Sequence, residues 1–201
     1  MLSYLDYLLI RPLFFVGLIP LVLILLIVFV RKRDIPKVKI IVLSVIFYLY
    51  VYIMLFDIVG TPSLAQINRM MIHHEGLFHP QLEFIPFADG LSLSTILNVI
   101  LFLPFGFLLP LMSKAYQKAS NTIFLGLGFS SFIELSQLFT PYRASDINDL
   151  ITNVLGTVIG YLIFRLIKNG IGIQRQANQF DGLSWLPEAI LLLSFIMVFI
   201  S

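Results

Sequence analysis

The chain has 201 residues, of which 59% are hydrophobic and only 12% charged, and its mean hydropathy is +0.97. These values lie far outside the range of soluble globular domains and exclude a soluble protein. The formal net charge of +2 is too small and too scattered for a partner such as nucleic acid. Because the chain has no cysteine, disulfides, thiolate metal sites and a cysteine nucleophile are excluded as well.

Several apolar runs approach or exceed the ~20 residues with which a helix crosses a bilayer. They predict an all-α fold, a polytopic transmembrane bundle of five to six helices that forms a single membrane domain over residues 1–201. The first run ends at a basic triplet instead of a small-residue cleavage site, so it is not expected to be a cleaved signal. The last run is the shortest, which leaves open whether it spans fully. The expected helices cover about residues 12–30, 38–59, 91–112, 122–138, 149–167 and 186–200.

Lysines and arginines predict how the bundle is oriented. If the connections after the first, third and fifth helices share one side, that side holds ten of the thirteen basic residues. Cytoplasmic loops are enriched in positive charge, so we expect this side to be cytoplasmic and both termini to lie outside.

The longest outer connection, residues 61–90, mixes titratable and apolar side chains and is expected to lie on the outer membrane face. Its His73-His74-Glu75 run contains zinc-type ligands. Neighbouring histidines do not share a helix face, so a solvated or headgroup-facing loop is the preferred interpretation.

Polar residues follow one face of each of the last two long helices before residue 170. The stripe on the fifth helix consists of Asp146, Asp149, Asn153, Gly156 and Gly160. The stripe on the fourth helix consists of Gly126, Ser130, Glu134 and Gln137. The two helices are joined by a short turn, so the stripes should face each other in an antiparallel pair. The GxxxG pair of the fifth helix would let another helix approach closely.

Three helices place polar groups at a similar depth. With a rise of about 1.5 Å per residue, Asn98, Glu134 and Asn153 lie roughly 6 to 10 Å below the outer helix ends. Ionisable groups at membrane depth are costly and mark functional sites by default. We therefore expect a shared polar site in the outer leaflet.

Structural roles remain open for several of these residues. Asp146 would serve as the cap of the fifth helix, and Asp149 as an acid favoured in its first turn. The three amides would serve as interhelical hydrogen-bond partners: Asn98, Gln137 and Asn153.

Glu134 is the residue that is hardest to explain structurally. It is expected to be protonated if unpaired, and charged if it is paired with Arg143 or with a bound cation. Arg143 would serve as this partner or bind a lipid phosphate at the outer interface.

The third helix contains the run NVILFLPFGFLLP. Pro104 removes a backbone donor and should kink this helix, with Gly106 easing the fit. A kink there would widen the outer half of the bundle into a pocket. Phe102 and Phe105 would either line that pocket or pack in the core.

Three stretches resemble motifs of the VanZ-like family of bacterial membrane proteins. They are NVILFLPFG in the third helix, the E-x-x-Q pair at 134 and 137, and the D-I-x-D-L-x-x-N-x-x-G-x-x-x-G run at 146–160. The FIPF segment at 84–87 is similar to the family's segment before the third helix. The resemblance covers about residues 40–167 and leaves the helices at 12–30 and 186–200 as flanking elements. It implies a multi-pass protein of the bacterial plasma membrane linked to low-level resistance to teicoplanin-type lipoglycopeptides, with no agreed mechanism. Arg143 matches some members but not the founding teicoplanin-resistance protein.

The favoured function is a non-enzymatic binder without a cofactor, and the sequence identifies no catalytic residues. A lipid or the acyl tail of a lipoglycopeptide would occupy the pocket, and its polar head would meet Asn98, Gln137, Arg143 and Asn153. The serines of the fourth helix have no histidine within their motif, which argues against a serine hydrolase.

Two alternatives remain open. In the first, Glu134, Asp146 and Asp149 hold a magnesium or calcium ion in an enzyme that acts on lipid-linked cell-wall precursors. In the second, the protein is a small transporter or assembly partner, and a homo-oligomer would compensate for the few helices.

Overall fold

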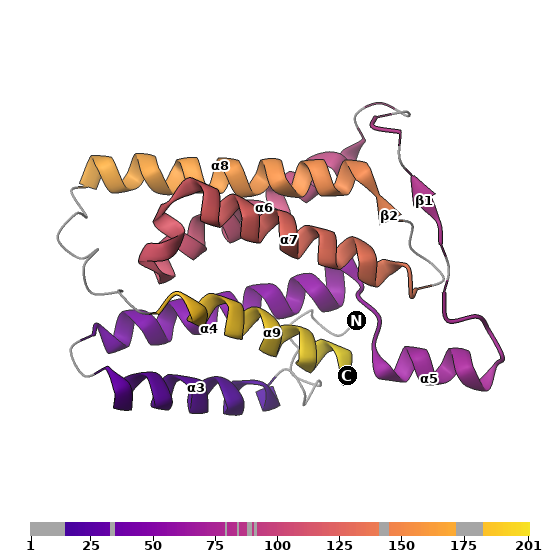
Figure 1. Ribbon diagram of the computed structural model, residues 1–201, viewed down its shortest axis with the longest axis horizontal. Helices are drawn as coiled ribbons and strands as arrows, with labels where there is room; N and C mark the ends of the chain where they lie inside the picture. The colour runs from indigo at the N-terminus through magenta and orange to yellow at the C-terminus, as the bar shows by residue number, and fades with distance from the viewer. Residues whose placement is uncertain are drawn as a thin grey trace, which may run out of the picture.

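The computed structural model describes residues 15–32, 35–78, 80–83, 85–87, 90, 92–140, 145–171 and 183–201. Within these residues, six long helices lie side by side and alternate in direction along the chain (Figure 1). Their bounds are α3 Leu18–Arg31, α4 Lys37–Ile53, α6 Leu93–Met112, α7 Ala119–Gln137, α8 Ile147–Ile171 and α9 Trp185–Phe199. The predicted all-α bundle is therefore confirmed, although α7 and α8 begin two or three residues earlier than expected.

Among the described residues, three helical stretches are long and apolar enough to cross a membrane: Lys37–Ile72, Leu93–Met112 and Ile147–Asn169. α3 and α9 are shorter apolar helices. α7, with 19 residues, is not among these three stretches. These helices support the prediction of a membrane protein.

α4 continues into η1 (Met54–Val59), a π-helix that ends at Gly60 with a left-handed backbone, φ 70°. A short helix, α5 (Leu64–Ile72), follows. Ser63 caps it, because its hydroxyl accepts the backbone N–H of Gln66 at 3.3 Å. The expected outer loop 61–90 thus contains a helix that the sequence analysis did not predict.

Two short strands tie this outer connection to the turn between α7 and α8. β1 (Leu82–Glu83) and β2 (Ser145–Asp146) pair in parallel, with Leu82 opposite Ser145 and Glu83 opposite Asp146. The backbone N–H of Ser145 also donates to the carbonyl of Gln81 at 2.8 Å. Both strands lie at the end of the bundle that carries α5 (Figure 1).

Aromatic side chains fill the core between α4, α6 and α7. Phe105 is fully buried, stacks on Phe129 with ring centroids 5.2 Å apart, and lies 5.9 Å from Phe47. Phe102 is fully buried beside it, at 5.7 Å. Of the two roles considered for Phe102 and Phe105, the structure therefore assigns core packing.

α8 packs on α6 with direct contact between the two backbones. A Cβ atom added at Gly160 would lie 2.1 Å from the carbonyl oxygen of Leu103, and one at Gly156 would lie 2.3 Å from that of Val99. No side chain fits at either distance, so only glycine allows this approach.

Two further glycines meet Thr157 of α8 from the neighbouring helices. A Cβ at Gly106 of α6 would lie 2.0 Å from the Thr157 carbonyl oxygen, and one at Gly126 of α7 would lie 2.7 Å from its side chain. Small residues thus bring α6, α7 and α8 together below the polar residues.

α6 remains helical through both of its prolines, Pro104 and Pro110. Pro104 leaves the carbonyl of Ile100 without its usual helical donor. At the next residue, Leu101, the carbonyl accepts the hydroxyl of Tyr50 from α4 at 2.6 Å. Such a donor from a neighbouring helix is how polar backbone near a proline is satisfied in a membrane helix. The expected kink itself stays a prediction.

Charges separate towards the two ends of the bundle. The basic end comprises the C-terminal end of α3, the start of α4, η2 (Lys114–Gln117) and the C-terminal end of α8 (Figure 1). Its described basic residues are Arg31, Lys32, Lys37, Lys39, Lys114, Lys118, Arg165 and Lys168. The acidic end, at the opposite ends of these helices, carries Asp57, Glu75, Glu83, Glu134, Asp146 and Asp149.

Candidate functional site

Polar side chains from α6, α7 and the start of α8 gather at the acidic end. We call them the polar cluster: Asn98, Ser130, Glu134, Gln137, Asp146, Asn148, Asp149 and Asn153. Glu134, Gln137 and Asn153 are only 4–7% exposed. Such burial is costly for polar groups unless they are hydrogen-bonded, so the partners of each one matter.

Glu134 holds the start of α8. Its Oε2 accepts the backbone N–H of Asp146 at 2.9 Å. The Glu134 carboxyl group on α7 thus has a backbone N–H of the α7–α8 turn as its hydrogen-bond donor. Glu134 is therefore part of the closure between α7 and α8.

Asp146 caps α8, which is one of the two roles that the sequence left open. Its Oδ1 accepts the backbone N–H of Asn148 at 2.8 Å, and its Oδ2 accepts the Asn148 side-chain amide at 3.2 Å. Asn148 in turn accepts the backbone N–H of Phe87 through Oδ1 at 2.7 Å. Asn148 thus links the cap of α8 to Phe87 in the outer connection.

Asn98 links α6 to α8. Its side-chain amide donates to Oδ1 of Asp149 at 2.6 Å. Asp149 also lies in the first turn of α8, where the helix dipole favours an acid. The sequence analysis expected Asn98 at the depth of Glu134 and Asn153, whereas the structure bonds it to Asp149, one turn nearer the start of α8 than Asn153.

Asn153 links α8 to α7 one turn deeper. Its side-chain amide donates to the hydroxyl oxygen of Ser130 at 3.0 Å, so the two polar stripes meet at this pair. The rest of the α8 stripe was expected to face α7 as well, but Asp149 bonds to Asn98 of α6, and Gly156 and Gly160 meet the α6 backbone. Gln137 points to another element, because its amide donates to the carbonyl of Val59 in η1 at 3.4 Å.

Two buried oxygen atoms of the polar cluster have no hydrogen-bond partner among the described residues, Oδ1 of Asn153 and Oε1 of Gln137. Both are acceptors, and the donors of the same two amides are already used. Buried acceptors of this kind are rare in folded proteins, and each retains the capacity to accept a hydrogen bond.

The cation site of the enzyme alternative is not assembled among the described residues. Within the part of the chain that the structure describes, no three His, Asp or Glu side chains lie close enough to hold a metal ion. Glu134, Asp146 and Asp149 instead bond to separate partners. His73, His74 and Glu75 are exposed at the end of α5.

Some expectations are neither met nor contradicted. Arg143 and Phe84 lie outside the described residues, so the pairing of Arg143 with Glu134 stays a prediction. An outer pocket beside Asn98 stays a prediction as well. Asn148 was missed by the sequence analysis, although its place between two motif aspartates could have singled it out.

A scan against protein-family models matches the VanZ/LLP1 family over residues 40–168. Neither the search of curated proteins nor the search of solved structures finds a match. The matched region contains α6, α7 and α8 with the whole polar cluster, and it agrees with the motif resemblance over residues 40–167. This chain belongs to the VanZ/LLP1 family.

Proposed function

We propose that this VanZ-family protein binds the polar head of an amphipathic molecule, a membrane lipid or a lipoglycopeptide, at the polar cluster. Binding would keep the drug away from its cell-wall target and so contribute to resistance against teicoplanin-type compounds. The protein acts here as a binder and not as an enzyme.

The observation that carries this proposal is the pair of unsatisfied buried acceptors, Asn153 Oδ1 and Gln137 Oε1. Asn153 lies between α7 and α8, and Gln137 lies one turn from Glu134 on α7 with its amide towards η1. A ligand that donates a hydrogen bond to either oxygen would satisfy a buried acceptor. An ammonium, amide or hydroxyl group of a lipid or glycopeptide head has this chemistry.

The surroundings of the cluster suit the apolar part of such a molecule. Leu93, Leu97, Leu135 and Phe139 expose apolar side chains near the same helix ends. In a bilayer these side chains would contact acyl chains. The basic end would face the cytoplasm, which puts the polar cluster in the outer leaflet of a multi-pass protein, where a drug arriving from outside would meet it.

Drug susceptibility in a sensitive Gram-positive host tests the proposal. Strains carry empty vector, wild type, Glu134→Gln or Glu188→Gln, with membrane levels matched by immunoblot. Glu188→Gln is the matched control, because it is the same substitution at the basic end. We expect wild type and Glu188→Gln to protect against teicoplanin and Glu134→Gln to lose protection, whereas a glycopeptide without an acyl chain should show a smaller difference.

Equal protection by Glu134→Gln and wild type would refute a role for the charge of Glu134. If wild type does not protect, the resistance proposal fails for this chain. Direct binding of teicoplanin to purified protein, measured by calorimetry in detergent, separates a lost interaction from a lost phenotype.

A further inference from the structure

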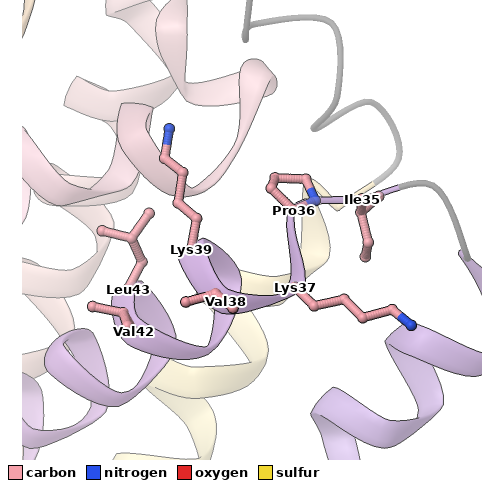
Figure 2. Close-up of a pocket in the computed structure, with 7 residues that line it drawn as sticks. All are labelled: Ile35, Pro36, Lys37, Val38, Lys39, Val42 and Leu43. Carbon is pink, nitrogen blue, oxygen red and sulfur yellow. The ribbon is translucent and has the colours of Figure 1, made fainter.

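A groove of about 700 Å³ opens at the basic end, far from the polar cluster. It is lined by residues 35–39 and by Val42 and Leu43, at the start of α4 (Figure 2). None of these residues contributes to the proposed function, so the groove calls for a separate explanation.

The wall of the groove is apolar and continues along α4. Val38 is 76% exposed, Val42 48% and Ile46 46%. Their spacing of four residues places them on one side of the helix, in a line directed towards the middle of the bundle. An extended hydrocarbon chain can follow this line out of the groove.

Two ammonium groups flank the groove. Figure 2 shows the Lys37 side chain directed towards α3 and the Lys39 side chain directed away from it. The Lys37 nitrogen lies 5.9 Å from the ring centroid of Phe29, which holds it on the α3 side. Both lysines belong to the stretch RKRDIPKVK at residues 31–39, which contains five basic residues and one acid.

We propose that this groove binds one anionic phospholipid. Its phosphate lies at the start of α4, where the long Lys37 and Lys39 side chains turn towards it from either side, and one acyl chain lies along Val38, Val42 and Ile46. Basic pockets on one side of a membrane protein recognise lipid head groups in this way.

Charge complementarity favours an anionic over a zwitterionic lipid. Among the described acidic residues, Glu188 lies at the basic end, where it accepts a hydrogen bond from the hydroxyl of Tyr116. A choline or ethanolamine ammonium would be repelled by the two lysines, whereas a head group with net negative charge would be attracted by both. Each lysine near a phosphate strengthens binding roughly fivefold.

Native mass spectrometry of the delipidated, full-length protein in detergent tests the proposal. Phosphatidylglycerol and phosphatidylcholine with identical acyl chains compete for the wild type, for Lys37→Gln/Lys39→Gln and for Lys114→Gln/Lys118→Gln. The last variant loses the same charge at the same end but outside the groove. Lys37→Arg/Lys39→Arg, which keeps the charge, checks that the positions themselves tolerate substitution.

We expect the wild type to prefer phosphatidylglycerol, and the Lys37/Lys39 glutamine variant to lose at least about fivefold of that preference. The Lys114/Lys118 and arginine variants should keep it, and glycerol phosphate, which has no acyl chain, should not displace the lipid. The proposal is overturned if the wild type shows no preference, if both glutamine variants lose it equally, or if glycerol phosphate competes as well as the lipid. Since Glu134 takes no part, failure here leaves the proposed function untouched.

Discussion

The backbone N–H of Asp146 donates to Oε2 of Glu134 over 2.9 Å. Twelve residues separate the two, and the bond closes the turn that joins the α7 stripe to the α8 stripe. The same carboxyl group is thus both the most unusual polar residue of α7 and a fastening point for the start of α8. Stability and function at Glu134 can therefore be separated by the choice of substitution.

Replacing Glu134 with leucine should destabilise the protein by about 1–3 kcal/mol, because the N–H of Asp146 loses its acceptor. Glu134→Gln keeps a side-chain oxygen and should unfold close to the wild-type temperature. Thermal unfolding of the purified protein in detergent measures both. A leucine variant as stable as the wild type would show that the Asp146 N–H finds another partner.

Asn98 and Asp149 should be energetically coupled, since their side chains bond directly at 2.6 Å. Alanine at either position should lower stability, and the double variant should be more stable than the sum of the two losses predicts, by about 0.5–2 kcal/mol. A double-mutant cycle by denaturant titration gives this coupling. Strict additivity would mean that the bond contributes nothing.

Gly160→Ala should separate α6 from α8, because the new methyl group would lie 2.1 Å from the backbone oxygen of Leu103, which cannot move without moving α6. We expect a loss of about 1–3 kcal/mol. Gly128→Ala on α7 is the matched control, as no atom lies within 4 Å of its added carbon. That control should be neutral or gain up to about 1 kcal/mol from higher helix propensity. Unfolding temperatures in the opposite order would disprove this account of the packing.

Tyr116→Phe should loosen α9 from the basic end, because the tyrosine hydroxyl in η2 donates to Oε1 of Glu188. Burial, with Glu188 beside it, raises the pKa of Tyr116 above its ordinary value. The hydroxyl therefore stays protonated, and its contribution is fully present below the ordinary tyrosine pKa of about 10. The variant should lose about 1–3 kcal/mol at any pH between about 6 and 9. An unchanged unfolding temperature, or a difference that disappears within this range, would count against the bond.

Helical periodicity was sufficient to predict much of the polar cluster. Residues three or four positions apart share a helix face, and the Asn153–Ser130 bond between α7 and α8 follows from that spacing. The rise per residue predicted Asn98 at the level of Glu134 and Asn153, whereas in the structure Asn98 bonds to Asp149, one turn nearer the start of α8. Periodicity names the face of a helix, but not which neighbour meets it, so the contact of Gly156 and Gly160 with α6 required the structure.

The outer connection could not be predicted in the same way. A parallel pair of two-residue strands has no repeat that a sequence pattern can reveal, and its partners are more than sixty positions apart. Asn148 joins Asp146 to Phe87 through contacts that depend on this pairing. The π-helix η1 was missed for a related reason, since its residues are as apolar as those of the α-helix before it.

The order of the helices has a consequence for how the protein matures. Synthesis runs from the N-terminus, so α6 and α7 leave the ribosome before α8. Asn98 and Glu134 belong to α6 and α7, whereas their partners Asp149 and Asp146 lie at the start of α8. Until that part of the chain arrives, a carboxyl group and an amide lack these partners. The polar cluster is therefore completed late in synthesis, and α6 and α7 depend on α8 for their final packing.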